Sequence, residues 1–227
     1  MLVSNNQDDQ EAAILALWAI SDQDGSYDSI EFHLNNLVPF LIHKLNSSSR
    51  DIRATTCWSL SKFSEWIGNN TENDKIFNDY HRMLVEKMGD PEENVQEAAC
   101  QAYSTLVEIH PNKCEPLLIG LFEKLNTVVD QYKDGPLIAM FDCVGSIAQA
   151  VSEGLKNQEI LQPLLQLLNK KWEQLEDNDR NMLTLFECFE SVVCAIKEEV
   201  EQYAPVIFNR CCKILRNVLK SIQVNYQ

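Results

Sequence analysis

Acidic residues recur along this chain at a nearly fixed interval, and that interval constrains the fold more than any other feature. Five acids form a first column in which neighbours are 43, 43, 45 and 45 residues apart. The members of this column are Asp22, Glu65, Glu108, Glu153 and Glu198. A period of roughly 40 to 47 residues is typical of helical solenoids. The sequence therefore predicts stacked helix pairs rather than one compact bundle.

A second column stands 11 residues before the first. Its members are Glu11, Ala54, Glu97, Asp142 and Glu187. Since 11 residues make almost three whole helical turns, each pair of column members is expected on one face of one helix. The residue four positions after each second-column member is expected on the same face. Stacked repeats would align these faces into a negatively charged strip, which predicts a surface that holds something basic.

Apolar residues recur at helical spacing almost throughout, and no alternating strand pattern competes. We call the helices that carry the acid columns B helices and the helices between them A helices. The ten predicted helices, beginning with a B helix, span 10–22, 31–46, 50–67, 72–89, 91–109, 112–131, 135–154, 157–177, 179–200 and 201–223. The sequence thus predicts an all-α fold, a right-handed α-α superhelix of HEAT repeats, as a single unit over 1–227.

This superhelix is expected to hold about four full repeats with half a repeat at each end. The predicted division is a B helix over 10–22, repeats over 31–67, 72–109, 112–154 and 157–200, and an A helix over 201–223. Because solenoids need polar caps and both ends read like interior repeats, the chain is expected to be a piece of a longer receptor.

Prolines recur inside the A helices. Pro39, Pro116, Pro163 and Pro205 each open an apolar stripe, and Asp79 takes the equivalent place in the remaining A helix. Proline inside a helix removes a hydrogen bond and costs about 3 kcal/mol, so its recurrence predicts a built-in bend. Helix pairs of this length with such prolines are typical of HEAT repeats.

The chain of 227 residues has a net charge of −15 and a sequence pI of about 4.6. This charge makes direct binding to nucleic acid unexpected and a cationic protein or peptide partner plausible. A simpler alternative is that the acidity only aids solubility; the placement of the acids in columns favours the partner. The N-terminus is no signal peptide and no apolar run reaches membrane-spanning length, so no membrane partner is expected.

The eight cysteines and four histidines show no metal-ligand spacing, and no CxxC motif occurs. Cys143, Cys188 and Cys194 lie in apolar runs. We therefore predict buried, reduced thiols in an intracellular compartment, with no metal and no cofactor. Nucleophile elbows, glycine-rich phosphate loops and HExxH motifs are missing from the sequence, so no enzyme activity is expected.

Two strings go beyond a generic HEAT pattern. Residues 57–62 (CWSLSK) and 95–100 (VQEAAC) resemble consecutive B helices of the transportin family of importin-β-type nuclear import receptors. Further matching strings follow in order at 141–146, 171–172, 185–188 and 205–211. The resemblance covers nearly the whole chain. It implies the central part of that superhelix, where B helices line the concave face, and a protein found in cytoplasm and nucleus.

The resemblance implies that this face binds cargo signals, which are basic, disordered segments ending in a Pro-Tyr dipeptide. Leu15 and Trp58 resemble the apolar contacts for the Pro-Tyr end. The polar and acidic contacts for the basic part are matched by Thr105, Glu108, Asp142, Ser146 and Glu187. Ran GTPase would bind repeats of the full-length receptor that have no counterpart here, and nucleoporins are further partners that the resemblance allows.

Three positions depart from the family pattern. Lys62 stands where the family usually has Arg, and a lysine cannot make the bidentate or stacked contacts that an arginine makes. Gln149 stands where the family has an acid, and Trp18 replaces a small residue and is expected to narrow the groove near the Pro-Tyr end. The alternative function is a HEAT-repeat scaffold that organises folded subunits of a multiprotein complex.

The candidate residues can also be interpreted from helical geometry alone, without the family resemblance. Trp58 is either an ordinary core tryptophan or an exposed packing surface. Its place within about 20° of Glu65 on a helical wheel favours exposure, so Glu65 joins the candidate site, whereas Trp66 and Trp172 fall off this face and are read as core. An exposed Trp58 would suit proline or tyrosine packing.

Asp142 and Glu187 interrupt strongly apolar helices. An unpaired carboxylate is costly to bury, so each must reach water, a partner cation or an internal Lys or Arg. Because stacked helices lie about 8–10 Å apart, the two acids are too distant to share a proton but suitably spaced for successive Lys or Arg residues of an extended peptide. The alternative is that they are solvated charges with no ligand.

Overall fold

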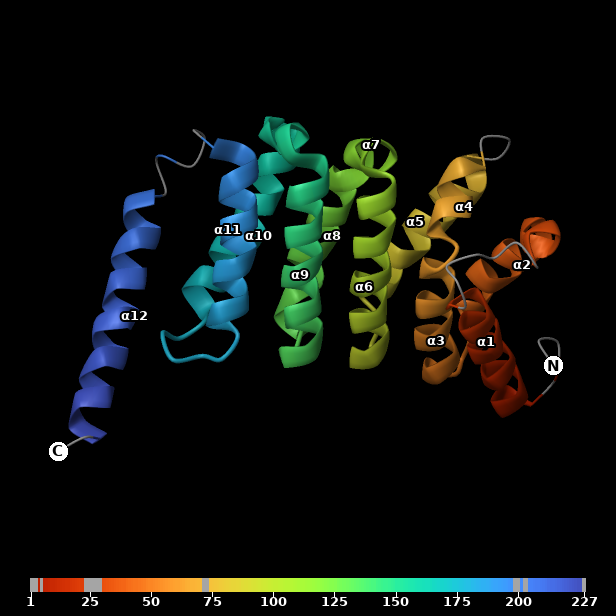
Figure 1. Cartoon of the computed structure of the whole chain (residues 1–227), viewed down its shortest axis with the longest axis horizontal. Helices are drawn as coiled ribbons and strands as arrows, with labels where there is room; N and C mark the ends of the chain where they lie inside the picture. Colours follow the sequence, from red (N-terminus) through yellow and green to blue (C-terminus); the bar gives the residue numbers. More distant parts are fainter. Residues whose placement is uncertain are drawn as a thin grey trace.

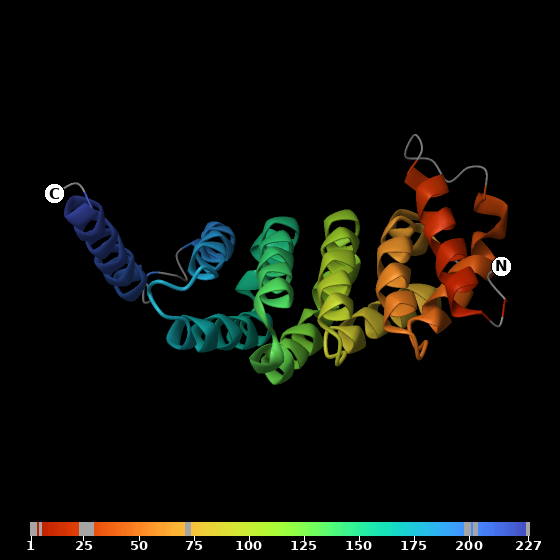
Figure 2. The same ribbon diagram turned by 90° about the horizontal axis from the view of Figure 1, so that it is seen from below.

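The computed structural model describes residues 4, 6–22, 30–70, 74–197, 201 and 204–225. Within these ranges the chain is helical and contains no β-strand. The helices form two layers that stack along one long axis (Figures 1 and 2). The prediction of an all-α repeat superhelix is therefore confirmed.

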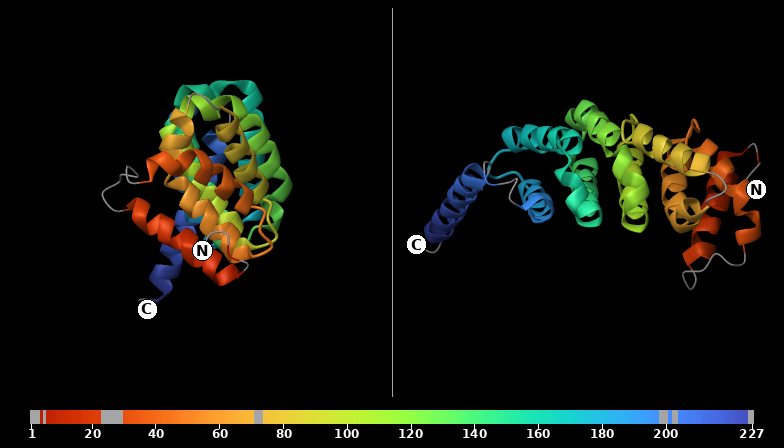
Figure 3. Two further views of the ribbon diagram at one scale, coloured as in Figure 1. Left: turned by 90° about the vertical axis from the view of Figure 1, so that its right-hand side faces the viewer. Right: turned by 90° about the horizontal axis from the view of Figure 1, so that it is seen from above.

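The B layer consists of five helices that stand side by side (Figure 1), each packed on the next. They are α1 (Gln7–Asp22), α3 (Arg50–Ser61), α6 (Glu93–Ile109), α9 (Asp134–Val151) and α11 (Met182–Ile196). The A layer consists of α2 (Glu31–Lys44), α5 (Asp74–Lys87), α8 (Leu118–Val128), α10 (Gln158–Gln174) and α12 (Ala204–Asn225). The A layer curves around the B layer, so the B helices line the concave side (Figures 2 and 3).

Local sequence explains several helix ends. The Ser49 side chain accepts a hydrogen bond from the backbone N–H of Ile52 at 3.4 Å and so caps α3, and Asn157 caps α10 in the same way. Pro111 occupies the first position of the short helix α7 (Pro111–Cys114), where its missing N–H costs nothing. These signals set the short connections between the layers.

The B helix expected over 50–67 is interrupted. Helix α3 ends at Ser61, and a separate helix α4 (Ser64–Asn69) begins three residues later. The Ser61 hydroxyl donates to the backbone oxygen of Trp58 at 2.8 Å, and Phe63 is fully buried at the break. Serine competes in this way with the helical ladder, which is the physical reason for the interruption.

The prolines lie inside A helices in only some of the expected places. Pro39 and Pro163 lie inside α2 and α10. Pro116 lies in a 3₁₀ turn, η1 (Glu115–Leu117), and with the further turn η2 (Val129–Gln131) it divides the helix expected over 112–131. Pro205 is the second residue of α12, where proline fits without a bend, so the expectation of a bend there was wrong.

A column of sulfur runs through the core between the layers. Cys57, Cys100, Cys143 and Cys188 are all buried, at intervals of 43, 43 and 45 residues, one from each of α3, α6, α9 and α11. Burial raises the pKa of Cys57 and Cys143 to about 12. All eight thiols are free and five are buried, which agrees with the prediction of mostly buried thiols; Cys211 and Cys212 are half-buried, and Cys194, which was expected in an apolar run, is exposed.

The segment Asp134–Lys156, which comprises α9 and the 3₁₀ turn η3 (Ser152–Lys156), is long and apolar enough to cross a membrane, with a mean hydropathy of 1.3. The sequence expectation that no run reaches this length was therefore wrong. More than half of the apolar window, 56%, is buried inside the molecule, and α9 packs between α6 and α11. Its hydropathy is explained by its central place in the stack.

Candidate functional site on the concave face

An apolar pocket of about 500 Å³ opens where α1, α3 and α6 meet. Its walls are Leu15, Trp18, Thr55, Trp58, Ser61, Lys62, Gln101, Ala102 and Thr105. The structure thus brings together four candidates predicted from the sequence, namely Leu15, Trp58, Lys62 and Thr105. The pocket spans three neighbouring repeats, so it exists only because the repeats stack in register.

Trp58 is 41% exposed, so its interpretation as a core residue is wrong, whereas Trp172 is buried and Trp66 packs against the core as expected. The indole Nε1 of Trp58 donates to Oε1 of Gln101 at 3.0 Å. Gln101 in turn donates from Nε2 to Oε1 of Glu97 at 3.3 Å. This chain of bonds holds the indole of α3 against α6 while leaving its face open to the pocket.

The opposite wall comes from α1. Leu15 is 44% exposed and Trp18 is 37% exposed, and both line the pocket. The ammonium nitrogen of Lys62 lies 5.6 Å from the centroid of the Trp18 ring, a cation–π contact. Lys62 follows the last residue of α3 directly, so the interruption of the B helix places the lysine at the pocket.

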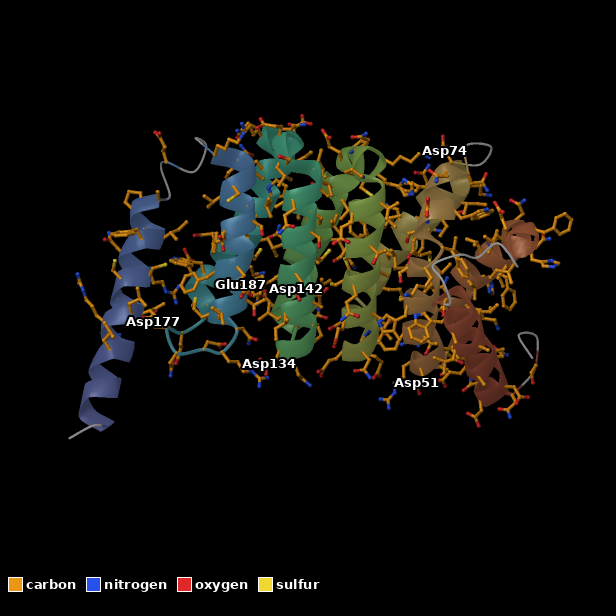
Figure 4. All side chains as sticks on the ribbon, in the orientation of Figure 1. Asp51, Asp74, Asp134, Asp142, Asp177 and Glu187 are labelled. Carbon is orange, nitrogen blue, oxygen red and sulfur yellow. The ribbon has the colours of Figure 1, made fainter. Side chains whose placement is uncertain are left out.

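A second hollow, polar rather than apolar, lies between α9 and α11. It has a volume of about 270 Å³ and is lined by Phe141, Asp142, Gly145, Ser146, Gln149, Glu187, Cys188 and Ser191. Figure 4 shows Asp142 and Glu187 near the middle of these two adjacent helices. The structure thus brings Asp142, Ser146 and Glu187 together, as their repeat positions predict.

The two carboxylates of this hollow are exposed, and neither has a Lys or Arg ion-pair partner among the described residues. Partial burial and the nearby charge of Glu187 raise the pKa of Asp142 above its ordinary value. Each acid therefore reaches solvent rather than an internal cation. The pair concentrates negative charge that a ligand cation could neutralise.

Glu108 of α6 contacts one residue of the acidic hollow. It is exposed near the end of α6 and accepts a hydrogen bond from the Ser146 hydroxyl of α9 at 2.7 Å. Gln149 makes the next link, donating from Nε2 to the Ser191 hydroxyl of α11 at 3.2 Å. A further hollow of about 610 Å³ continues past Gln149 and Glu187 to Glu190 and Cys194.

Several members of the acid columns do not join this surface. Glu65 is exposed but lies in α4, beyond the helix break, and lines neither hollow. Glu153 lies outside α9, in η3, because Ser152 leaves the helix with a φ of 50°. Its carboxylate pairs with Lys156 at 2.7 Å and with Lys197 at 2.9 Å, and these contacts lower its pKa to about 2. The Asp22 side chain and all of Glu198 lie outside the described residues.

Sequence reasoning missed Gln101 and Ser191, although a signal was present. Both stand four residues after a member of the second column, as do Leu15, Trp58 and Ser146. All five of these residues line the two hollows. The four-residue offset, which predicts one face for every repeat, therefore places both residues on this face, although neither is among the candidate site residues predicted from the sequence.

The class of protein follows from the fold and from a family comparison. Two layers of repeating helix pairs with a concave B surface define a HEAT-like solenoid. Residues 8–63, which include α1, α2 and α3, match the model of the HEAT-like repeat. In the part of the chain that the structure describes, no group of three or more His, Cys, Asp or Glu residues could hold a metal ion.

More specifically, the chain is similar in sequence to transportins. It is 29% identical to transportin-1 of Homo sapiens over 216 residues and 31% identical to transportin of Dictyostelium discoideum over 221 residues. It is 32% identical to importin subunit beta-2 of Saccharomyces cerevisiae over 212 residues. These matches cover 95%, 96% and 91% of this chain but only 24%, 23% and 22% of the relatives. The predicted resemblance is confirmed, and the chain spans about a quarter of the length of these relatives.

Solved structures share the fold. A designed armadillo repeat protein in complex with the peptide (KR)4 superposes with a TM-score of 0.65 at 18% identity, covering 84% of this chain and 78% of that one. Importin beta superposes with a TM-score of 0.50 at 15% identity over 92% of this chain and 33% of that one. At these identities the similarity is one of fold.

Proposed function

We propose that this chain is the cargo-binding segment of a nuclear import receptor. Its concave face would bind an extended, basic segment of a cargo protein that ends in a Pro-Tyr dipeptide. The apolar pocket would hold the Pro-Tyr end, with contacts from Leu15 and Trp58. The hollow of Asp142, Ser146 and Glu187, together with Glu108 and Thr105, would hold the basic part.

The observation that carries this proposal is the pairing of two unlike hollows on one continuous face. One is walled by exposed Leu15, Trp18 and Trp58, and the other by exposed acids that pair with no Lys or Arg among the residues the structure describes. An unpaired carboxylate that reaches solvent gains most from a guanidinium or ammonium, because charge-assisted hydrogen bonds are the strong ones. A peptide that is apolar at one end and basic along its length complements both hollows.

The spacing of the helices supports an extended ligand. Neighbouring stacked helices lie about 8–10 Å apart, whereas an extended chain advances about 3.3–3.6 Å per residue. Two or three peptide residues therefore pass each helix. The sequence relatives bear the names transportin and importin, which agrees with a transport role for this face. In a complete receptor, Ran GTPase and nucleoporins would be further partners, and the protein would occur in both cytoplasm and nucleus.

A fluorescence anisotropy titration tests the proposal. The probe is a labelled, unstructured peptide with several Lys and Arg residues followed by Pro-Tyr. Two control peptides share its length: in one Pro-Tyr is replaced by Ala-Ala, and in the other each Lys and Arg is replaced by Gln. The parent peptide should bind best, and its affinity should fall as salt is raised, because exposed charges are screened over about 8 Å at physiological ionic strength.

Equal binding of all three peptides, or binding of none, would contradict the proposal. Either result would favour the alternative of a HEAT-repeat scaffold that holds folded subunits. That alternative predicts an interface of about 1,200–2,000 Å² with a folded partner, rather than recognition of a short peptide.

A further inference from the structure

The apolar pocket has a second indole wall, Trp18, to which the proposed function gives no role beyond exposed apolar area. We infer that Trp18, together with Trp58, makes this pocket selective for an aromatic ring over an aliphatic side chain of similar volume. The inference rests on the proposed function, since it concerns the residue of the ligand that enters the same pocket. Trp18 would act as a specificity-determining residue rather than as general apolar area.

The two indoles enter the pocket from different helices. Trp18 comes from α1 and Trp58 from α3, while Gln101, Ala102 and Thr105 of α6 complete the wall. Both indoles are more than one-third exposed, at 37% and 41%. A side chain that enters this space of about 500 Å³ can contact both ring systems. Aromatic contacts add roughly two- to tenfold in affinity beyond what buried area alone gives.

Both indoles are held by contacts within the protein. Trp58 is oriented by the hydrogen bond from its Nε1 to Gln101, and Trp18 by the ammonium of Lys62 over its ring. Because these contacts exist without a ligand, less side-chain entropy is lost when a ligand binds. Two oriented indoles therefore form a ready-made site for a flat side chain.

The charge of Lys62 narrows the choice of ligand further. An exposed indole face could otherwise attract the guanidinium or ammonium of a basic peptide. Here a protein cation already lies 5.6 Å from the Trp18 ring and lines the same pocket. The cation-binding face of Trp18 is therefore already occupied by a cation of the protein.

The test compares three peptides on the wild-type chain and on Trp18→Ala, Trp18→Phe and Trp58→Ala. The peptides share a basic segment and differ only in the residue after proline, which is Tyr, Phe or Leu. The measured quantity is the ratio of the dissociation constants for the Leu and Tyr peptides. Phe32→Ala serves as the control, because Phe32 is a 90% exposed aromatic residue that does not line the pocket. Far-UV circular dichroism checks that each variant is folded.

We expect the wild-type chain to prefer Tyr and Phe over Leu by about tenfold, from contacts with two rings. Trp18→Ala should reduce this ratio to about threefold, Trp18→Phe should keep most of it because a ring remains, and Phe32→Ala should leave it unchanged. An unchanged ratio in Trp18→Ala would overturn the inference. So would tighter binding of the Tyr peptide by Trp18→Ala, because Trp18 would then obstruct the pocket.

These outcomes are separate from failure of the proposed function. If Trp58→Ala weakens binding of the Tyr peptide while Trp18→Ala leaves the ratio unchanged, the pocket is used and only the role of Trp18 is wrong. If the wild-type chain binds none of the three peptides, the proposed function itself is wrong.

Discussion

The two hollows of the concave face are built from the same position of the repeat but carry opposite chemistry. The residues four after the second column are Leu15 and Trp58 at the N-terminal end, Gln101 in the middle, and Ser146 and Ser191 toward the C-terminal end. The first two wall an apolar pocket, and the last two line an acidic hollow. Gln101 lies at the transition, with its amide bonded to both Trp58 and Glu97.

The two ends also differ in how their side chains are held. At the apolar end the groups are bound to one another, Trp58 to Gln101 and Lys62 to Trp18. At the acidic end Asp142 and Glu187 raise each other's electrostatic energy, and the pKa of Asp142 is raised by burial and by this neighbour. A repeat fold can thus keep one backbone and vary the residue four after the second column. The same backbone then supports both a preorganised apolar pocket and an exposed acidic site.

Charge reversal at the acidic end should give the largest effect. Glu108→Lys combined with Asp142→Lys should weaken a basic Pro-Tyr peptide roughly 100-fold at low salt, because like charges juxtaposed at an interface cost several kcal/mol. Raised salt should narrow the gap to wild type. The matched control is Asp79→Lys with Glu86→Lys, which changes the net charge equally on α5 of the A layer. An equal loss in the control would mean that net charge, not the hollow, governs binding.

Removing the exposed indole should affect the apolar end with a different salt response. Trp58→Ala should weaken the same peptide by about 1–3 kcal/mol, as expected for an interface anchor. The loss should change little with salt, since the lost interaction is burial rather than charge. Titrations of this variant and of the charge-reversal variant at two salt concentrations would check the division. The same salt sensitivity in both variants would contradict it.

The residue at the transition should give a smaller effect. Gln101→Ala removes the acceptor for the Trp58 indole, and binding should weaken by about 0.5–1.5 kcal/mol, the net value of one hydrogen bond. Gln101→Glu combined with Glu97→Gln keeps an acceptor for the indole and avoids a carboxylate pair, and it should retain most of the affinity. If both variants weaken binding equally, the hydrogen bond does not orient Trp58.

The smallest effect concerns stability. Because its pKa is raised in the folded state, ionised Asp142 opposes folding at neutral pH, and this penalty disappears as the pH falls through the raised value. Asp142→Asn should therefore raise the free energy of unfolding at pH 7, by less than about 1 kcal/mol since the group is partly solvated. The gain should shrink at pH 4. Urea denaturation at both pH values would measure it.

Glu123→Gln, a neutralisation of an exposed acid on α8, is the control for this stability measurement. A lower stability of Asp142→Asn at pH 7, or a gain that persists unchanged at pH 4, would show that the raised pKa of Asp142, from its partial burial and the charge of Glu187, is not the cause.

The period of the acids and the helical spacing of apolar residues were sufficient to predict the stacked fold, whereas the concave position of the B layer was implied by the family resemblance. The period also predicts that Trp58, Asp142 and Glu187 lie on the B-helix face, because a regular stack converts sequence period into position, and the structure places each of them in one of the two hollows. The failures lie where the backbone leaves the regular helix. The Ser61 hydroxyl bond and buried Phe63 separate Glu65 from Trp58. The positive φ of Ser152 takes Glu153 to two lysines.

The first break depends on a local serine hydrogen bond and the second on contacts between repeats. The period of the sequence carries information about neither. Lys197 reaches Glu153 from the next B helix, and Phe63 is buried among side chains of several helices. The hydrogen bond between Trp58 and Gln101 is of the same kind, since the period predicts the face on which Gln101 lies but not its contact with the neighbouring helix.

Each of four successive repeats has its own buried thiol, and the reaction of that thiol can report when the repeat opens. Cys57, Cys100, Cys143 and Cys188 are sealed in the core, and burial keeps their pKa values high, so a thiol reagent can react only when a repeat opens. Since contacts in a solenoid run only between neighbours, repeats can open one at a time. The labelling rate of each cysteine, measured by mass spectrometry with and without a bound peptide, would then show which repeats the peptide stabilises against opening.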